Sequence, residues 1–285
     1  MDKTDLGDRM KLYEAAEAKR KTMPLLPLMV RLDGKCFSSW TRGLQRPYDK
    51  RLSYVMTEVT RRLVEATNAR IGYTQSDEIT LVLYSDSFKS QIFCAGRFQK
   101  LTSILASMAT AWFNQLAQES LPEKADKLAF FDCRVWNVPN RVEATNTVLW
   151  RERDATKNSI SMAAREYYSH KETLGKSGTD LQEMLFQKGM NWNDYPAFFK
   201  RGTFIQRRIV THKMTCEDLE KLPEKHQARR NPELEIERSD IRVLEMPSFG
   251  SVTNRVEVIF EGEDPLQASE GKEAPYFGHT HVYFG

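Results

Sequence analysis

The spacing of apolar residues predicts the elements at the start of the chain. Residues 5–21 are rich in Ala, Glu and Lys and favour a helix. A short apolar run over 28–32 has the length of a strand and stops at Asp33 and Gly34, where glycine permits a tight exit. Apolar side chains then recur every three or four residues, as on a helix that begins at Asp49 and buries one stripe: Leu52, Val55, Met56, Val59 and Leu63.

The next segments predict a hairpin, a long helix and a further strand. Strands are expected over 69–73 and 79–84, joined by the polar turn 74–78. A helix is expected over 89–118 and a strand over 129–138. The order strand, helix, strand, strand, helix, strand is that of a split βαβ fold. It predicts an α+β palm of the polymerase and cyclase type, an antiparallel sheet with helices on one face.

The second half of the chain predicts a mainly helical appendage. A long helix is expected after Pro139, and a shorter one over 179–188. We therefore divide the chain into a palm with an N-terminal helix (1–138), a helical and mixed region packed on it (139–260) and a tail (261–285).

Composition excludes several classes of protein. With 285 residues, 40% of them hydrophobic, the chain can bury a full core. It has no apolar run of membrane-spanning length, and its N-terminus lacks the order of a secretion signal. We therefore expect a cytoplasmic protein with no membrane partner.

Charge, cysteine and histidine content say little about ligands. The net charge of +3 does not by itself indicate a nucleic-acid partner, so local basic patches would have to meet any polyanion. The four cysteines have no CxxC spacing, which argues against a zinc site. For the close pair His279 and His281, a solvated tail is favoured over a metal role.

Acidic residues fall at two places that this topology brings together. Asp33 ends the first strand, and Asp77 and Glu78 lie at the tip of the hairpin formed by the next two. In a split βαβ sheet these places are neighbours. Clustered carboxylates repel one another unless they share a cation, and hard oxygen ligands suit Mg²⁺. The hypothesis is a two-metal site for phosphoryl transfer.

A phosphate-binding segment is predicted beside these acids. Residues 33–38 follow a glycine turn, where successive backbone N–H groups can form an anion-binding nest. Arg97 and Lys100 share one helix face and would contact the outer phosphates. Each feature alone is more often structural, because such turns, hairpin tips and basic faces are usually solvated surface. Their joint placement favours the functional interpretation.

Short motifs extend this pattern from about residue 5 to about residue 210. They read Met10-Lys11-x-Tyr13-Glu14, Arg31-Leu32-Asp33-Gly34-x-x-Phe37, Arg46-Pro47-x-Asp49, Tyr73-x-Gln75-Ser76-Asp77-Glu78, Arg97-x-x-Lys100-Leu101-x-Ser103, Phe131-Asp132-x-Arg134, Trp150-Arg151-x-x-Asp154-Ala155-x-x-Asn158-Ser159, Leu185-Phe186-x-x-Gly189-x-Asn191 and Lys200-x-Gly202-Thr203. In these motifs the chain resembles the histidine-tRNA guanylyltransferase superfamily, whose members extend nucleic acid in the 3′-to-5′ direction.

The resemblance implies roles for individual residues. Asp33, Asp77 and the Gly34 carbonyl would bind two Mg²⁺ ions, and Glu78 would be a further catalytic carboxylate. Arg46 and Asp49 match positions near the nucleotide base. The incoming nucleotide would be held by one set of residues: Asp33, Gly34, Lys35, Cys36, Phe37, Ser38, Ser76, Asp77, Arg97 and Lys100.

The resemblance also implies partners. Members of the superfamily activate a 5′-monophosphate end with ATP or GTP, and the 3′-hydroxyl of an incoming GTP or other nucleoside triphosphate then attacks that end. They are commonly homotetramers, dimers of dimers that share tRNA between subunits. Contacts with tRNA are expected from residues beyond the palm: Asn158, Lys200, Arg201, Arg207 and Arg208. The alternative for the basic residues is an exposed face with no partner.

One departure from the superfamily pattern bears on the substrate. The histidine-specific eukaryotic enzymes carry the motif His-Ile-Asn-Asn-Leu-Tyr-Asn, whereas this chain has Thr156-Lys157-Asn158-Ser159-Ile160-Ser161-Met162. The stretch resembles instead the like-protein branch of bacteria and archaea, which copies a template to repair 5′-truncated tRNAs. Templated repair is therefore favoured over dedicated addition of an extra 5′ guanylate.

Two other functions use parts of the same pattern. A nucleotide cyclase has the same palm, but it has no use for the motifs downstream of residue 150. A non-catalytic RNA-binding protein has no need of Asp33, Ser76, Asp77 and Glu78 together. Both alternatives are less favoured than nucleotide addition to tRNA.

Overall fold

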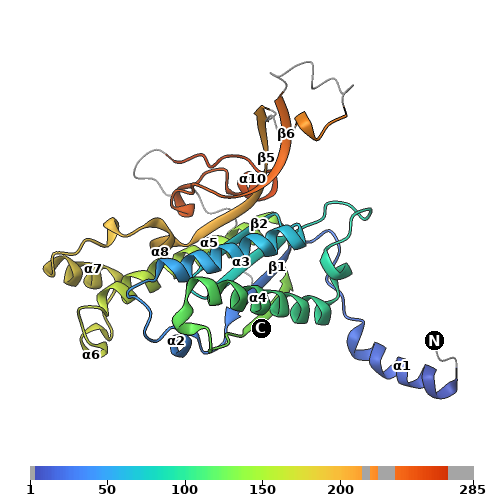
Figure 1. Cartoon of the computed structure of the whole chain (residues 1–285), viewed down its shortest axis with the longest axis horizontal. Coiled ribbons are helices and arrows are strands. Elements are labelled where there is room, and N and C mark those ends of the chain that lie inside the picture. The colour runs from blue at the N-terminus through green and yellow to red at the C-terminus, as the bar shows by residue number, and fades with distance from the viewer. Residues whose placement is uncertain (1–3, 214–218, 224–234, 269–285) are drawn as a thin grey trace.

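A six-stranded antiparallel sheet in the order β4-β1-β3-β2-β5-β6 forms the centre of the computed structural model, which describes residues 4–213, 219–223 and 235–268 (Figure 1). Its strands are β1 (Leu28–Gly34), β2 (Ile71–Gln75), β3 (Glu78–Leu83), β4 (Phe131–Asn137), β5 (Thr203–Lys213) and β6 (Glu235–Val243). Helices α3 (Lys50–Thr67) and α4 (Phe98–Ser120) connect the first four strands in split βαβ order. The predicted palm is confirmed.

The two palm helices begin for different local reasons. Asp49 caps α3 as predicted, and its carboxylate accepts a hydrogen bond from the Arg51 N–H at 2.9 Å. Helix α4 begins at Phe98, later than predicted. The delay arises because Cys94 and Ala95 adopt left-handed backbone angles (φ 56° and 51°) in the short turn η1 (Phe93–Gly96).

The face of the sheet under α3 and α4 is packed with apolar side chains. Its buried members come from β1, β3 and both helices, and include Leu28, Val30, Leu32, Val59, Leu63, Ile79, Leu81, Leu101, Leu105 and Phe113. At Gly72 in β2 a Cβ atom would lie 2.7 Å from the Val64 Cγ2 and 2.8 Å from the Thr60 Cγ2. Glycine there lets α3 lie directly against the sheet.

The opposite face is covered only in part. Helices α5 (Arg141–Ala164) and α10 (Arg255–Phe260) pack on a second apolar cluster that includes Met29, Ile71, Val82, Val148, Phe204, Phe249 and Ile259. Toward β4 this face is open, because the side chains of Asp132 and Arg134 are 54% and 55% exposed. The predicted helices on one face are therefore joined by α5 and α10 on the other.

Strands β5 and β6 come from the region that the sequence assigns to the appendage. β5 extends the palm sheet because Phe204 pairs with Tyr73 and Ile205 with Gly72. β5 and β6 then form a long hairpin that projects from the body (Figure 1). The palm sheet is thus not confined to residues 1–138.

A small helical unit lies between α5 and β5. It contains α6 (His170–Thr173), α7 (Gly178–Gln187) and α8 (Ala197–Arg201), and a third apolar cluster fixes it to the C-terminal end of α5: Ile160, Ala163, Ala164, Leu181, Leu185 and Phe199. Ser177 and Asp180 form a capping box at the start of α7. This part of the predicted appendage is helical, as expected.

The two ends of the chain differ in how they are held. Helix α1 (Asp5–Ala18) buries no side chain and projects from the body (Figure 1). Of the predicted tail, residues 261–268 are held by contacts such as the Thr253 N–H donating to the Leu266 carbonyl at 2.8 Å. The other tail residues, with His279 and His281, lie outside the described residues. Among the described residues, no helix has both the length and the apolar character needed to cross a membrane.

Candidate active site

The two predicted metal-binding aspartates lie beside each other. The Gly34 N–H donates to the Asp77 carbonyl at 3.2 Å, and Asp33 pairs with Glu78 across β1 and β3. Burial raises the pKa of the Asp77 carboxyl to about 6, and the charges of Asp33 and Glu78 add to the rise. A nearby cation would favour the ionised forms of these groups.

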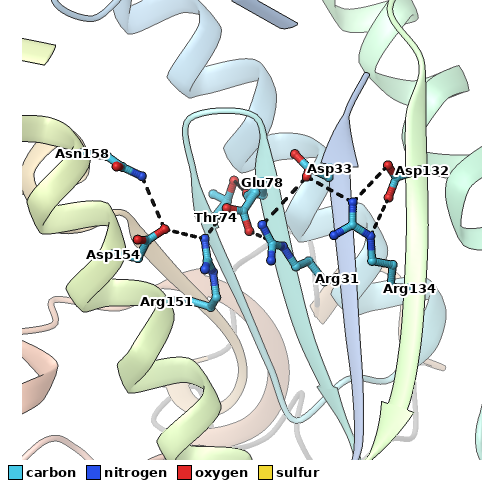
Figure 2. A network of polar contacts seen from close by, with 9 residues as sticks. All are labelled: Arg31, Asp33, Thr74, Glu78, Asp132, Arg134, Arg151, Asp154 and Asn158. Atoms are coloured by element: carbon cyan, nitrogen blue, oxygen red, sulfur yellow. Dashed lines mark hydrogen bonds and ion pairs between the residues drawn. The ribbon is translucent and has the colours of Figure 1, made fainter. Parts of the chain in front are cut away.

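Glu78 lies between two arginines. Its Oε1 is 2.6 Å from the Arg31 Nε, and its Oε2 accepts a short hydrogen bond from the Arg151 Nη2 (Figure 2). Burial raises the pKa of Glu78, although the charges of Arg151 and Arg31 oppose the rise. Because both arginines neutralise this carboxylate, the geometry gives Glu78 the role of holding Arg151 and also Arg31, whose Nη2 lies 3.8 Å from the Asp33 Oδ2.

Two further residues adjoin Asp33 from β4. Asp132 pairs with Asp33 across the strands, and the Arg134 Nη2 lies 3.5 Å from the Asp33 Oδ2. The Arg134 Nε also lies 3.3 Å from the Asp132 Oδ1. The open part of the sheet face therefore carries both carboxylates and guanidinium groups next to the predicted metal ligands (Figure 2).

Helix α5 continues this network away from the strands. The Arg151 Nη2 donates to the Asp154 Oδ2 at 3.0 Å, and the Asn158 Nδ2 donates to the same oxygen at 3.4 Å. Asn158, predicted to contact tRNA, is thus exposed at the outer end of a chain of contacts that begins at the active site (Figure 2).

A cavity of about 630 Å³ opens beside Asp77. Its size lies within the range of small-molecule and cofactor sites. Several residues that were predicted to bind nucleotide line it: Cys36, Phe37, Ser38, Arg46, Asp49, Ser76 and Asp77. Tyr48 and Phe199 contribute aromatic surface, with ring centroids 4.9 Å apart.

The predicted anion nest is smaller than 33–38. The N–H groups of Gly34 and Lys35 donate to the carbonyls of Asp77 and Phe130, so neither is directed at a ligand. The amides of residues 36–38 start the short helix α2 (Phe37–Trp40), where helix geometry leaves N–H groups without a carbonyl four residues earlier. A Cβ at Gly34 would lie 2.2 Å from the Phe37 ring, so the turn requires glycine.

Three residues that were predicted to bind the nucleotide lie in positions that revise their predicted roles: Asp49, Arg97 and Lys100. The Asp49 carboxylate is 5% exposed, because it caps α3 and is bound by the Arg51 guanidinium. That engagement gives it a role in shaping the cavity wall. Arg97 and Lys100 are exposed at the start of α4 and do not line the cavity, so a phosphate there would lie outside it.

The predicted basic residues do not form one surface. The Lys200 ammonium bonds to the Asn193 carbonyl, and burial followed by the charge of Arg201 lowers its pKa. Arg207 and Arg208 are consecutive in β5 and therefore point to opposite faces. The Arg208 guanidinium donates to the carbonyls of Gly262 and Glu263, so it holds the fold and is no longer proposed to contact RNA. The Arg207 Nη1 donates to the Ser239 Oγ at 2.9 Å.

The donor set suits magnesium. Within the described ranges, no group of three or more His, Cys, Asp or Glu side chains is arranged to hold a metal ion. Two carboxylates, Asp33 and Asp77, are nevertheless adjacent, and Mg²⁺ is commonly bound through one or two carboxylates plus substrate phosphates and waters. The residues present therefore fit the predicted ion.

Sequence reasoning missed two functions of α5. Arg151, which is 6% exposed, forms part of the network at Glu78, and the Oε1 of Glu152, which is 2% exposed, accepts from the Phe249 N–H at 2.8 Å. The resemblance included Arg151 among its motifs, but no role followed from it. An arginine followed by a glutamate on a helix ordinarily predicts a solvated face.

The fold and site together define a class of protein. A split βαβ palm with one carboxylate on its first strand and another in the turn before its third strand, beside a cavity of nucleotide size, has the arrangement of a palm-type nucleotidyltransferase.

Comparisons with known proteins agree with that class. A family model described as tRNAHis guanylyltransferase matches residues 7–139. A bacterial tRNA(His) guanylyltransferase-like protein solved in complex with ATP is 39% identical, with a TM-score of 0.67 over 71% of this chain and 88% of that chain. A bacterial protein of the same description in complex with GTP is 32% identical, with a TM-score of 0.65 over 86% and 94% of the two chains. An uncharacterized protein of Acanthamoeba polyphaga mimivirus is 30% identical over 72% of this chain and 78% of its own length.

The chain belongs to the tRNA(His) guanylyltransferase family, within its branch of guanylyltransferase-like proteins, and is a nucleotidyltransferase. The superfamily and the enzyme class predicted from the motifs are confirmed.

Proposed function

We propose that this enzyme adds nucleotides to the 5′ end of tRNA in the 3′-to-5′ direction, and that it copies the opposite strand to repair 5′-truncated tRNAs. The observation that carries the proposal is the adjacency of Asp33 and Asp77 beside a nucleotide-sized cavity, at the edge of an open sheet face. Templated repair is supported by residues 156–162, which lack the histidine-specific motif, and by the likeness to bacterial proteins of the same branch.

The residues of the site have distinct proposed roles. Asp33 and Asp77, with the Gly34 carbonyl, would hold Mg²⁺. When bound, the ions would lower the pKa of the attacking hydroxyl and neutralise charge on the triphosphate and the departing pyrophosphate. The cavity would orient the nucleoside, and the guanidinium groups of Arg31 and Arg134 would attract the phosphate at the RNA 5′ end.

Nucleotide use and assembly are further parts of the proposal. The bacterial relatives are described in complex with ATP and with GTP, which supports ATP or GTP as the activating nucleotide and GTP or other triphosphates as substrates. Arg97 and Lys100 remain proposed contacts for the outer phosphates. We also propose a cytoplasmic homotetramer in which subunits share one tRNA, as the family resemblance implies.

The test is nucleotide addition to a labelled tRNA that lacks its first 5′ nucleotide. Wild type, Asp77→Ala and the exposed control Asp8→Ala are each supplied with Mg²⁺ and one nucleoside triphosphate at a time. We expect wild type and Asp8→Ala to add only the nucleotide complementary to the opposing base, and Asp77→Ala to add none.

Other outcomes contradict separate parts of the proposal. Addition of a guanylate alone, and only to intact histidine tRNA, would replace templated repair by dedicated guanylylation. Absence of addition by wild type, with release of a cyclic nucleotide, would favour a cyclase. RNA binding that is unchanged in Asp77→Ala, without addition by any variant, would favour a binding protein.

A further inference from the structure

A large aromatic side chain is exposed on α5 next to the active-site network. Trp150 is 55% exposed, whereas its neighbours Leu149 and Arg151 are 2% and 6% exposed. Single exposed apolar residues are common on protein surfaces, so exposure alone carries no argument. The contacts of this indole are what distinguish it.

The indole is held from one side by a buried cation. The Arg151 Cζ lies 4.6 Å from the centroid of the Trp150 ring. Arg151 is in turn fixed by Glu78 and Asp154. Because the guanidinium covers one face of the ring and itself cannot move freely, the exposed area of Trp150 belongs to a ring of fixed orientation.

The position of Trp150 relates it to the reacting groups. Trp150, Asp154 and Asn158 are four residues apart, so they form one row along α5 that extends about 12 Å. Contacts run from the ring through Arg151, Glu78 and Arg31 to Asp33. The row therefore adjoins the charged network at which the RNA end is proposed to lie.

We propose that Trp150 is a stacking platform for the template nucleotide, the base of the opposite strand that is unpaired until the incoming nucleotide joins. This inference rests on the proposed function, because only templated addition requires such a base. An unpaired base exposes its π-face, and stacking on an aromatic ring tolerates any base. A platform of this kind suits an enzyme that copies different template nucleotides.

The test compares Trp150→Ala with Trp150→Phe on a tRNA that lacks its first 5′ nucleotide. The matched control is Phe88→Ala, which removes a 77% exposed ring from the loop between β3 and α4. We expect Trp150→Ala to raise the KM for tRNA about tenfold, with the KM for the nucleoside triphosphate unchanged. Trp150→Phe, which retains a ring, and Phe88→Ala are expected to stay within about twofold of wild type.

A second measurement identifies the base that stacks. When an abasic residue replaces the template nucleotide, RNA binding by wild type is expected to weaken about tenfold, and binding by Trp150→Ala to weaken no further. Equal weakening of both proteins would overturn the inference, as would a wild-type KM for tRNA in Trp150→Ala. A wild-type enzyme that adds nothing to any truncated tRNA would overturn the proposed function first, and this inference with it.

Discussion

The two faces of the palm sheet have different compositions, and strand β1 displays both. On one face Leu28, Val30 and Leu32 are fully buried under α3 and α4. On the other, Arg31 and Asp33 keep 20% and 29% of their side-chain surface exposed and form part of a charged network. Successive side chains of a strand point to opposite faces of the sheet. In β1, apolar side chains therefore stabilise the fold on one face, and charged side chains contribute to the site on the other.

This separation has an energetic basis. A face closed by two helices excludes water and gains from every apolar atom it buries. Charged groups are tolerated on the other face because it is partly open and because arginines and carboxylates alternate across it. Mutations on the two faces should thus have different consequences, one mainly for folding and the other mainly for activity.

The largest effect is expected from Asp77→Asn, in the turn between β2 and β3 that adjoins the charged network. Loss of a metal-binding carboxylate is expected to lower the rate of nucleotide addition at least about 10³-fold. Without metal, thermal stability should stay the same or rise, since burial disfavours the charged form of this group. Single-turnover rates and thermal unfolding check the two halves. A large loss of stability, with activity retained in the folded fraction, would contradict the expectation that substitutions in the charged network affect mainly activity.

Phe113→Ala, on the closed face, is expected to act in the reverse way. Removing this fully buried ring should lower the free energy of unfolding by about 3–5 kcal/mol through lost burial and a cavity. At a temperature where the variant stays folded, nucleotide addition should remain within about twofold of wild type. Urea unfolding measures the first effect, with Phe88→Ala as the exposed control. A specific loss of nucleotide affinity would show that the closed face also shapes the site.

Glu152 tests a buried acid outside the metal site. Burial raises its pKa from the ordinary 4.5 to about 7, so between these values the folded protein keeps a proton that the unfolded chain releases. The free energy of unfolding should therefore fall as pH rises through this window and level off above it. Glu152→Gln has no titrating carboxyl at this position. The free energy of unfolding of the variant minus that of wild type should therefore increase from pH 5 to pH 8 by on the order of 2 kcal/mol.

Thermal unfolding at pH 5, 6.5 and 8 measures that difference. Glu119→Gln, an exposed acid on α4, is the control and should show no trend. A constant difference between Glu152→Gln and wild type across the three pH values would mean that Glu152 is ionised in the fold throughout this range.

The smallest effect is expected from substitution of Arg207 or Arg208 in β5, two residues that have different contacts in the structure. The logarithm of the tRNA binding constant falls linearly with the logarithm of salt concentration. Arg207→Ala should make that slope shallower by about one, as for loss of a single phosphate contact. Arg208→Ala should leave the slope unchanged and lower the melting temperature, because Arg208 holds the turn at residues 262 and 263. Binding titrations over a salt series distinguish the pair. Equal slopes for both variants would return Arg208 to the RNA surface.

Much of the palm follows from local pattern. The stripe from Leu52 to Leu63 and the cap at Asp49 predict α3, and alternating strands around a polar turn predict the β2–β3 hairpin. β5 could not be predicted in the same way, since its pairing with β2 joins residues as distant as Gly72 and Ile205. The residues of β5 do not by themselves indicate which sheet the strand joins.

Some site residues could likewise be predicted from the sequence, and others could not. Asp33 and Asp77 could be predicted because Asp33 lies near the end of β1 and Asp77 in the turn before β3, the strand that pairs with β1. The roles of Arg151 and Glu152 depend on how α5 docks on the sheet and on contacts with Glu78 and Phe249. Such contacts between distant segments leave no periodic signal in the sequence. The basic residues predicted to contact tRNA are likewise distributed over two elements, since Lys200 and Arg201 lie in α8 and Arg207 and Arg208 in β5.

Templated repair is tested most directly by changing only the RNA. A tRNA lacking its first 5′ nucleotide is prepared in four forms that differ in the base opposite the missing position, and wild-type enzyme receives all four nucleoside triphosphates with Mg²⁺. Templated repair predicts that the added nucleotide changes with the opposing base and is its Watson–Crick partner in each form. Addition of the same nucleotide to all four would contradict templated repair.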